Sequence, residues 1–270
     1  MYDVAVVGSR GFLGSAIAAA LEARGASVGR FTKHEPFTGG ASTIVWAAGH
    51  VTPADTANGP AALADLGELI ETARRSPHLP HVLLLSSGGA VYGPPARAPF
   101  AETDEPSPAN EYGRIKLAEE RLLADSGVPH TVLRVANPYG PGRRGRRGVI
   151  GAWLASIAEG APVTLYGDGS TVRDFVYVDD LAAAIATAAE RTPGGIINLG
   201  SGRGTSLARL LEIVTDAVAP HPVEVRREPA RGVDPAAAFL DVTRAREMLG
   251  WSATTPLAEG IARTWAAVRA

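Results

Sequence analysis

The 270-residue chain has no cysteine and only two lysines, Lys33 and Lys116, beside 24 arginines. The absence of cysteine excludes disulfide frameworks, thiolate metal sites and cysteine nucleophiles. With 26 basic and 28 acidic residues the net charge is only -2, which argues against nucleic acid or a membrane surface as a partner. No stretch approaches about 18 consecutive apolar residues, so no transmembrane helix is expected. These absences predict a cytoplasmic protein.

Short apolar runs that alternate with helical patterns dominate the first half of the chain. Hydrophobic residues make up 46% of the sequence, which is ample for a large core. Residues 32–42 contain Pro36 and a glycine pair, so a loop is expected there in place of a crossover helix. The alternation predicts an α/β fold with a Rossmann-like, doubly wound parallel sheet. Strands are expected at residues 4–7, 27–31, 43–48, 81–85 and 130–135, and helices at 12–24, 61–75 and 110–125.

After Asn137 the sequence becomes rich in turns and in shorter elements. We expect residues 1–137, rejoined by about 175–200, to form the Rossmann domain. Residues 138–174 and 201–270 are expected to form a smaller C-terminal α/β part on its carboxyl edge. Within 138–270 the expected helices are 150–159, 181–190, 206–218, 243–249 and 257–268, and the expected strands are 163–166, 174–178, 196–198 and 223–227.

Gly8, Gly11 and Gly14 form a GxxGxxG pattern directly after the first expected strand. The first glycine permits a tight turn, the second lets the backbone approach a pyrophosphate, and the third lets helix and strand pack closely. The N-terminus of the following helix offers free amides and a partial positive charge to the phosphates. A glycine-rich turn without a ligand is the alternative. The pattern predicts a dinucleotide site, and its spacing matches that of short-chain dehydrogenases.

The end of the second strand bears on the choice between NAD and NADP. Dinucleotide folds usually place an acid there to hold the adenosine ribose. This strand ends instead in Thr32-Lys33-His34, without an acid. Lys33, with Arg30, would suit the 2′-phosphate of NADP, whereas an exposed loop lysine is the alternative.

Tyr112 and Lys116 form a YxxxK pattern at the start of an expected helix, where residues four apart share one face. Hydride transfer at an alcohol or ketone needs a group that exchanges the hydroxyl proton. A free tyrosine has a pKa of about 10, and a neighbouring ammonium favours its phenolate. Because the chain uses arginine almost everywhere else, this spacing is hard to obtain by accident. An ordinary surface pair on an amphipathic helix is the alternative.

These motifs together resemble the extended short-chain dehydrogenases, in particular the NAD-dependent epimerase/dehydratase family that acts on nucleotide sugars. The resemblance covers nearly the whole chain. It depends on the segments GSRGFLG (8–14), SSGGAVYG (86–93), YGRIK (112–116), LRVANPYGPG (133–142), GDGSTVRDFVYVDDLAAA (167–184) and LGW (249–251).

The resemblance implies a role for individual residues. Tyr112 is the implied acid/base, and Lys116 holds the nicotinamide ribose and favours the phenolate. Asn137 is implied to contact substrate. The implied diphosphate clamp is Arg173 and Arg231, because guanidinium groups suit a pyrophosphate. The implied cofactor contacts are Gly8, Arg10, Gly11, Phe12, Leu13, Gly14, Thr32, Lys33, Ala47, Ala48 and Gly49, with Tyr112 and Lys116.

The two arginines of the implied clamp have plainer alternatives. Arg173 could instead form a salt bridge to Asp174 or Asp179, and Arg231 could be a surface arginine. The basic run at residues 143–147 is either a solvated loop or the source of one further phosphate contact.

The sequence departs from the family pattern at the end of the fourth strand. The usual Ser or Thr four residues before the tyrosine of VYG is Gly88, so Ser87 is the candidate hydroxyl for the catalytic and substrate site. A strand-to-turn transition is the alternative, because serine and glycine are turn residues. The acidic pair of the 4,6-dehydratases is replaced by Gly89 and Ala90, which cannot move protons. A dehydratase is therefore not expected.

The sequence thus predicts an NAD(P)-dependent enzyme, a homodimer by resemblance, that acts on a nucleoside-diphosphate sugar. Hydride transfer at sugar carbon 4 could serve a 4-epimerase or an NADPH-dependent 4-ketoreductase. A catalytically silent cofactor-sensing or interaction protein on the same fold is the alternative of another class.

Overall fold

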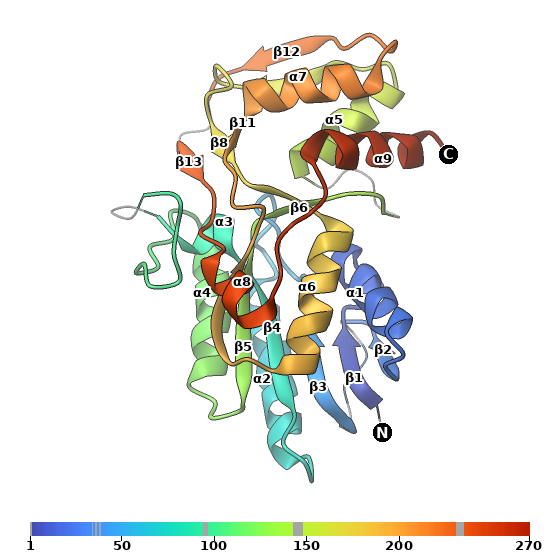
Figure 1. Cartoon of the computed structure of the whole chain (residues 1–270). Coiled ribbons are helices and arrows are strands. Elements are labelled where there is room, and N and C mark those ends of the chain that lie inside the picture. The colour runs from blue at the N-terminus through green and yellow to red at the C-terminus, as the bar shows by residue number, and fades with distance from the viewer. Residues whose placement is uncertain are drawn as a thin grey trace.

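Six parallel strands form the central sheet of the protein, in the order β10-β5-β4-β3-β1-β2 (Figure 1). The structure is a computed structural model, and it describes residues 2–33, 35, 37, 39–93, 97–142, 148–230 and 235–270. The strands are β1 (Tyr2–Val7), β2 (Val28–Phe31), β3 (Ala41–Trp46), β4 (His81–Ser87), β5 (His130–Val135) and β10 (Gly195–Leu199). The middle of β4, residues 82–85, is continuously apolar and buried because helices cover both faces of the sheet.

Two pairs of helices cover the sheet. On one face lie α1 (Phe12–Ala23) and α6 (Val178–Arg191), which share one core cluster. On the other face lie α2 (Gly59–Arg75) and α4 (Glu111–Ala124), which contact each other. This arrangement confirms the predicted doubly wound α/β fold.

The C-terminal part has a second core beyond the carboxyl edge of the sheet (Figure 1). Its main elements are α5 (Gly148–Ala158), β7 (Val163–Tyr166), α7 (Leu207–Val218), β12 (Val225–Glu228) and α9 (Leu257–Arg269). Shorter strands connect the two parts: β6 (Asn137–Tyr139), β8 (Val172–Arg173), β9 (Phe175–Tyr177), β11 (Thr205–Ser206) and β13 (Ala237–Ala238). Residues 238–251, with α8 (Thr243–Leu249), pack into the main core, although they belong to the expected C-terminal part. The division of the chain into two parts stays a prediction.

Most expected elements agree with the structure to within a few residues. The segments 130–135, 163–166 and 243–249 agree at both ends. No helix lies between β2 and β3 among the described residues there, as the proline and glycines predicted. The expected strand at 174–178 corresponds to β9. The short helix α3 (Gly88–Val91) and the strands β6, β8, β11 and β13 were not predicted, because they are too short for a periodic pattern.

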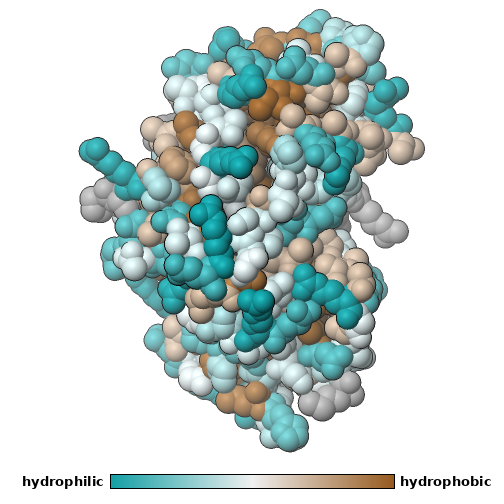
Figure 2. All heavy atoms as spheres, in the orientation of Figure 1, coloured by the Kyte–Doolittle hydropathy of each residue, from teal (hydrophilic) through white to brown (hydrophobic). Residues whose placement is uncertain are grey.

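The face of the molecule in Figure 2 is of mixed hydropathy, with hydrophobic residues scattered among hydrophilic and intermediate ones. The exposed large hydrophobic residues are Tyr2, Leu79, Leu122 and Val225, from separate parts of the chain. Of the helices that the structure describes, none combines the length and the apolar character needed to cross a bilayer.

A buried ion pair joins α4 to β5. The Arg134 guanidinium donates to the Glu120 carboxylate at 2.7 and 3.1 Å, and Ser86 donates to the same carboxylate. Both charged side chains are at most 6% exposed. Such a pair contributes little net stability, but either partner alone is a buried uncompensated charge.

We therefore expect Arg134→Ala to lower the free energy of unfolding by about 3–5 kcal/mol, measured by urea denaturation. The double variant Arg134→Met, Glu120→Leu removes both charges and is expected to recover most of that loss. As a control, Arg114→Ala breaks an exposed pair with Glu111 on the same helix and should cost at most about 1 kcal/mol. Equal losses in Arg134→Ala and Arg114→Ala would contradict the argument from burial.

Candidate active site

The glycine turn between β1 and α1 leaves no room for side chains. Gly8 has φ +90°, and a Cβ on it would lie 2.6 Å from the Ala47 carbonyl oxygen. A Cβ on Gly14 would overlap the Gly8 carbonyl oxygen. Gly11 precedes α1 without a side-chain cap, and the first turn of the helix has no acid. The turn therefore presents a cradle of backbone amides that fits a pyrophosphate.

Neighbouring segments converge on this turn. The Ala47 amide donates to the Val7 carbonyl at 2.9 Å, and Ala48 lies beside Gly8. On the other side, a Cβ on Gly142 would lie 2.7 Å from the Phe12 ring, so the NPYGPG segment reaches the start of α1. The structure thus brings several predicted cofactor residues together. Of the others, Arg10 and Gly49 are exposed and Leu13 packs against the main core.

A cavity of about 330 Å³ opens beside the end of β2. Glu35 lies in its wall, and its carboxylate accepts the Thr32 amide at 2.7 Å. That hydrogen bond lowers the pKa of Glu35. The sequence prediction missed this acid because it lies in the loop beyond the strand end. The cavity is lined by Val7, Lys33, Glu35, Phe37, Trp46, Asp65, Glu68, Leu69 and Thr72.

The two basic candidates for a 2′-phosphate differ in their surroundings. Lys33 shares the cavity with three carboxylates, those of Glu35, Asp65 and Glu68. Arg30 donates two hydrogen bonds, at 2.7 and 2.8 Å, to Glu22 on α1. In the cavity lining, Lys33 is therefore outnumbered by acidic side chains.

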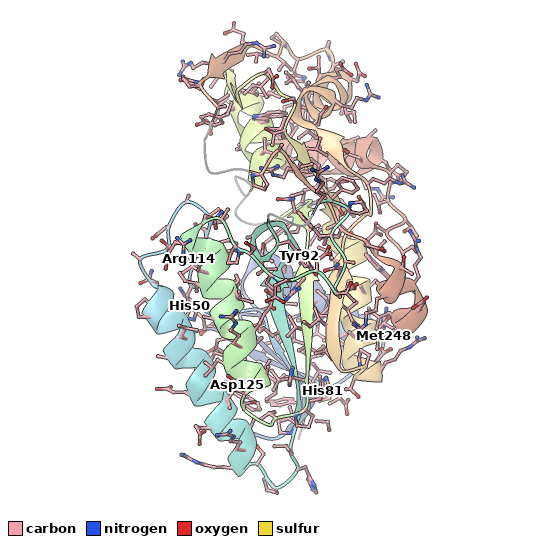
Figure 3. All side chains as sticks on the ribbon, turned by 90° about the vertical axis from the view of Figure 1, so that its left-hand side faces the viewer. His50, His81, Tyr92, Arg114, Asp125 and Met248 are labelled. Carbon is pink, nitrogen blue, oxygen red and sulfur yellow. The ribbon has the colours of Figure 1, made fainter. Side chains whose placement is uncertain are left out.

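The head of α4 lies directly against α3. Asn110 caps the helix by accepting the Gly113 amide at 2.9 Å, and a Cβ on Gly113 would overlap the Ala90 carbonyl oxygen. In Figure 3, Arg114 marks this upper end of α4 and Asp125 the lower end, while Tyr92 lies near the level of the upper end. The close contact therefore holds the first turn of α4 at the carboxyl edge of the sheet.

Tyr112 and Lys116 both lie on this part of α4. Tyr112 is half-buried and packs with Val51 and Ile115. Lys116 is 7% exposed and donates to Glu119 at 2.8 Å and to the Leu85 carbonyl at 3.4 Å. Burial opposes the charged form of Lys116, yet the adjacent Glu119 carboxylate and then Tyr112 raise its pKa above the ordinary value. At neutral pH the lysine is an ammonium next to the tyrosine.

The residues after β4 differ in what they can offer a ligand. Ser86 is buried and already donates to Glu120. Ser87 is half-buried at the start of α3, and its hydroxyl does not cap that helix. A Cβ on Gly88 would lie 2.7 Å from the Leu240 side chain. Of the two serines, Ser87 is therefore the better candidate hydroxyl.

Asn137 and Arg173 lie where the two parts of the chain meet. Asn137 donates through Nδ2 to the Asp174 carbonyl at 2.9 Å, and the atom nearest to a Cβ on Gly89 would be this Nδ2, at 3.9 Å. Arg173 donates to the carbonyls of Val172 and Pro235, both at 2.9 Å. The Asp174 carboxylate, proposed above as an alternative partner of Arg173, accepts hydrogen bonds from Ser201 and Gly202. Arg231 and residues 143–147 lie outside the described residues.

This arrangement is that of a dinucleotide-binding fold with a polar site on its carboxyl edge. Residues 38–200 match the model of the NAD dependent epimerase/dehydratase family. The chain therefore belongs to this family, as its motifs predicted.

Individual relatives cover different shares of the chain. UDP-glucose 4-epimerase of Mycolicibacterium smegmatis is 38% identical over 192 residues, which are 68% of this chain and 60% of that protein. dTDP-4-dehydro-6-deoxyglucose reductase of Escherichia coli is 33% identical over 199 residues, 70% of this chain and 61% of that protein. The chain thus spans about three fifths of the length of these relatives. Among solved structures, UDP-glucose 4-epimerase of Thermus thermophilus in complex with NAD superimposes with a TM-score of 0.83 at 27% identity, over 98% of each chain.

We expect Gly8→Ala to weaken NAD binding at least tenfold and to lower the melting temperature, because the new Cβ meets the Ala47 carbonyl. Gly25→Ala is the matched control, since Gly25 has a similar φ of +86° but nothing within 4 Å of its Cβ. The control should lose about 1 kcal/mol of stability from backbone strain alone and keep its affinity for NAD. Fluorescence titration and thermal melts measure both effects. Unchanged NAD affinity in Gly8→Ala would show that the glycine turn does not bind the pyrophosphate of NAD.

Proposed function

We propose that the chain is an NAD-dependent 4-epimerase of a nucleoside-diphosphate sugar. The observation that carries the proposal is the placement of Tyr112 and Lys116 on the first two turns of α4, where Gly113 rests against Ala90. This end of α4 lies at the carboxyl edge of the sheet, as does the glycine turn. Membership of the family and the similarity to enzymes named UDP-glucose 4-epimerase support the choice of substrate class and reaction.

The described residues fit NAD at several points. The amides of the glycine turn would hold the pyrophosphate, and Glu35 would accept from an adenosine ribose hydroxyl. Lys116 would donate to the nicotinamide ribose. When bound, NAD supplies a hydride acceptor that can return the hydride to the other face of the sugar.

The protein side chains would handle the proton and the orientation of the sugar. Tyr112 takes the proton from the hydroxyl on carbon 4 as the carbon is oxidised, and gives it back when the carbon is reduced. The Lys116 ammonium favours the phenolate form of that tyrosine. Ser87 and Asn137 would orient the sugar oxygen, and Arg173 and Arg231 would hold the diphosphate. Gly89 and Ala90 offer no acid for the elimination of water.

A second candidate function is reduction of a 4-keto nucleotide sugar. The similarity to the Escherichia coli reductase favours it, and the same Tyr112 and Lys116 would serve. The two functions differ in the fate of the cofactor. A purified protein that retains NAD and interconverts two sugar nucleotides is an epimerase, whereas one that consumes a reduced cofactor stoichiometrically is a reductase. The homodimer and the cytoplasmic location remain predictions.

The first test is Tyr112→Phe. We expect this variant to lose at least about 100-fold in turnover of UDP-glucose, because the phenyl ring cannot exchange the proton. Its affinities for NAD and for UDP-glucose, measured by calorimetry, should stay within a factor of about three. A wild-type protein that binds NAD but turns over no sugar nucleotide would instead support the catalytically silent alternative.

The second test concerns the cofactor. We expect NAD to bind at least about tenfold more tightly than NADP, because Glu35, Asp65 and Glu68 repel a 2′-phosphate more than Lys33 attracts it. Glu35→Gln should narrow this ratio, and Glu212→Gln, at an exposed glutamate of α7 that lies outside the cavity lining, should leave it unchanged. If NADP instead binds more tightly than NAD, this prediction is wrong, and the NADP preference predicted from Lys33 is supported.

A further inference from the structure

Glu119 is a buried carboxylate on the same helix as the acid/base pair, and none of the roles above uses it. It lies three residues after Lys116 and is 1% exposed. Its Oε2 accepts a hydrogen bond from the Lys116 ammonium at 2.8 Å. A carboxylate is rarely buried to this extent unless it is paired.

We propose that Glu119 is a positioning residue that fixes the charge and the direction of Lys116 and thereby sets the pH range in which Tyr112 exchanges protons. The proposal rests on the proposed function for its catalytic meaning. The contact itself, between two side chains of the protein, does not depend on which sugar is the substrate.

Glu119 and the adjacent Glu120 have separate cationic partners. Glu120 is engaged by Arg134 at 2.7 Å and by the Ser86 hydroxyl. Glu119 is therefore left as the counter-ion of Lys116. Two buried cations and two buried carboxylates balance each other, so removal of Glu119 leaves one net positive charge beside Tyr112.

The hydrogen bonds of Lys116 also restrict its direction. An ammonium has three N–H donors. One of them points to Glu119 and a second to the Leu85 carbonyl in β4. Among the described residues the third has no partner, so we expect it to be available to a ligand on the carboxyl edge. Without Glu119 the long lysine side chain would lose the stronger of its two anchors.

The strongest charges on this pair come from α4 itself. Glu119, Tyr112 and Glu120 act on Lys116, and Lys116 and Glu120 act on Glu119. Of the elements packed against α4, β5 contributes the Arg134 guanidinium, which is held by Glu120. Burial raises the pKa of Glu119, and the Lys116 ammonium opposes that rise. Removal of the Glu119 charge should therefore favour deprotonation of both Lys116 and Tyr112.

The first experiment replaces Glu119 by Gln, which removes the charge and keeps the size. The phenolate of Tyr112 is followed by ultraviolet absorbance, with Tyr112→Phe as the background, in the wild type and in the variant. We expect it to form about one pH unit lower in Glu119→Gln. The pH profile of kcat/KM should move down by a similar amount at both limbs, because Tyr112 governs the rise and Lys116 the fall.

Two further variants separate charge from structure. Glu119→Asp keeps the carboxylate, so its phenolate titration should lie at least halfway back from that of Glu119→Gln to that of the wild type. Glu111→Gln removes an exposed carboxylate of the same helix and should leave the phenolate titration unchanged. Identical titrations in folded wild type and Glu119→Gln would overturn the proposal, as would a shift of equal size in Glu111→Gln.

A measurement on the wild type covers the case in which Glu119→Gln does not fold. With only two lysines in the chain, protein labelled with ¹⁵N-lysine gives two side-chain signals, and Lys33→Arg assigns them. The Lys116 signal should show an ammonium that persists to higher pH than that of a free lysine. Loss of its proton below that pH would overturn the proposal. Absence of turnover with UDP-glucose, by contrast, would count against the proposed function and leave these titrations valid.

Discussion

The contact between Gly113 and the Ala90 carbonyl sets where the proposed chemistry can take place. Any Cβ at residue 113 would separate α4 from α3, so the glycine lets the first turn of the helix rest on α3, which follows β4. Tyr112 on that turn and Lys116 on the next then share the carboxyl edge with the glycine turn and with Ser87. A helix shifted outward would leave the same side chains on an ordinary surface.

That placement requires charges in a region that excludes water. The face of α4 that meets the sheet carries Lys116, Glu119 and Glu120, all buried. They are tolerated because each is paired, Lys116 with Glu119 and Glu120 with Arg134 of β5. The protein thus holds an ammonium beside a tyrosine without leaving an uncompensated charge in the core. The scarcity of lysine elsewhere in the chain makes this single buried lysine stand out.

The fold could be predicted from the sequence because it depends on local patterns, and the same kind of pattern singled out the residues of the candidate site. Apolar runs gave the six strands, the glycine spacing gave the turn, and the spacing of Tyr112 and Lys116 gave the pair. Glu35 and Glu119 were missed for a different reason. A carboxylate in a loop and one on a charged helix both look like surface residues until tertiary packing places Glu35 at the cavity and buries Glu119 against Lys116. The partners of these two carboxylates are set by tertiary contacts, which produce no periodic pattern in the sequence.

The end of β4 shows how packing and chemistry constrain each other. At Gly88, where the family resemblance implies a hydroxyl, the Leu240 side chain would lie 2.7 Å from a Cβ. Leu240 belongs to the stretch that returns from the C-terminal part into the main core. A hydroxyl at residue 88 would therefore need both a larger side chain there and a smaller one at 240. With that position filled by a hydrocarbon, the proposed orientation of the sugar oxygen depends on Ser87 and on Asn137, whose Nδ2 would lie 3.9 Å from a Cβ on Gly89.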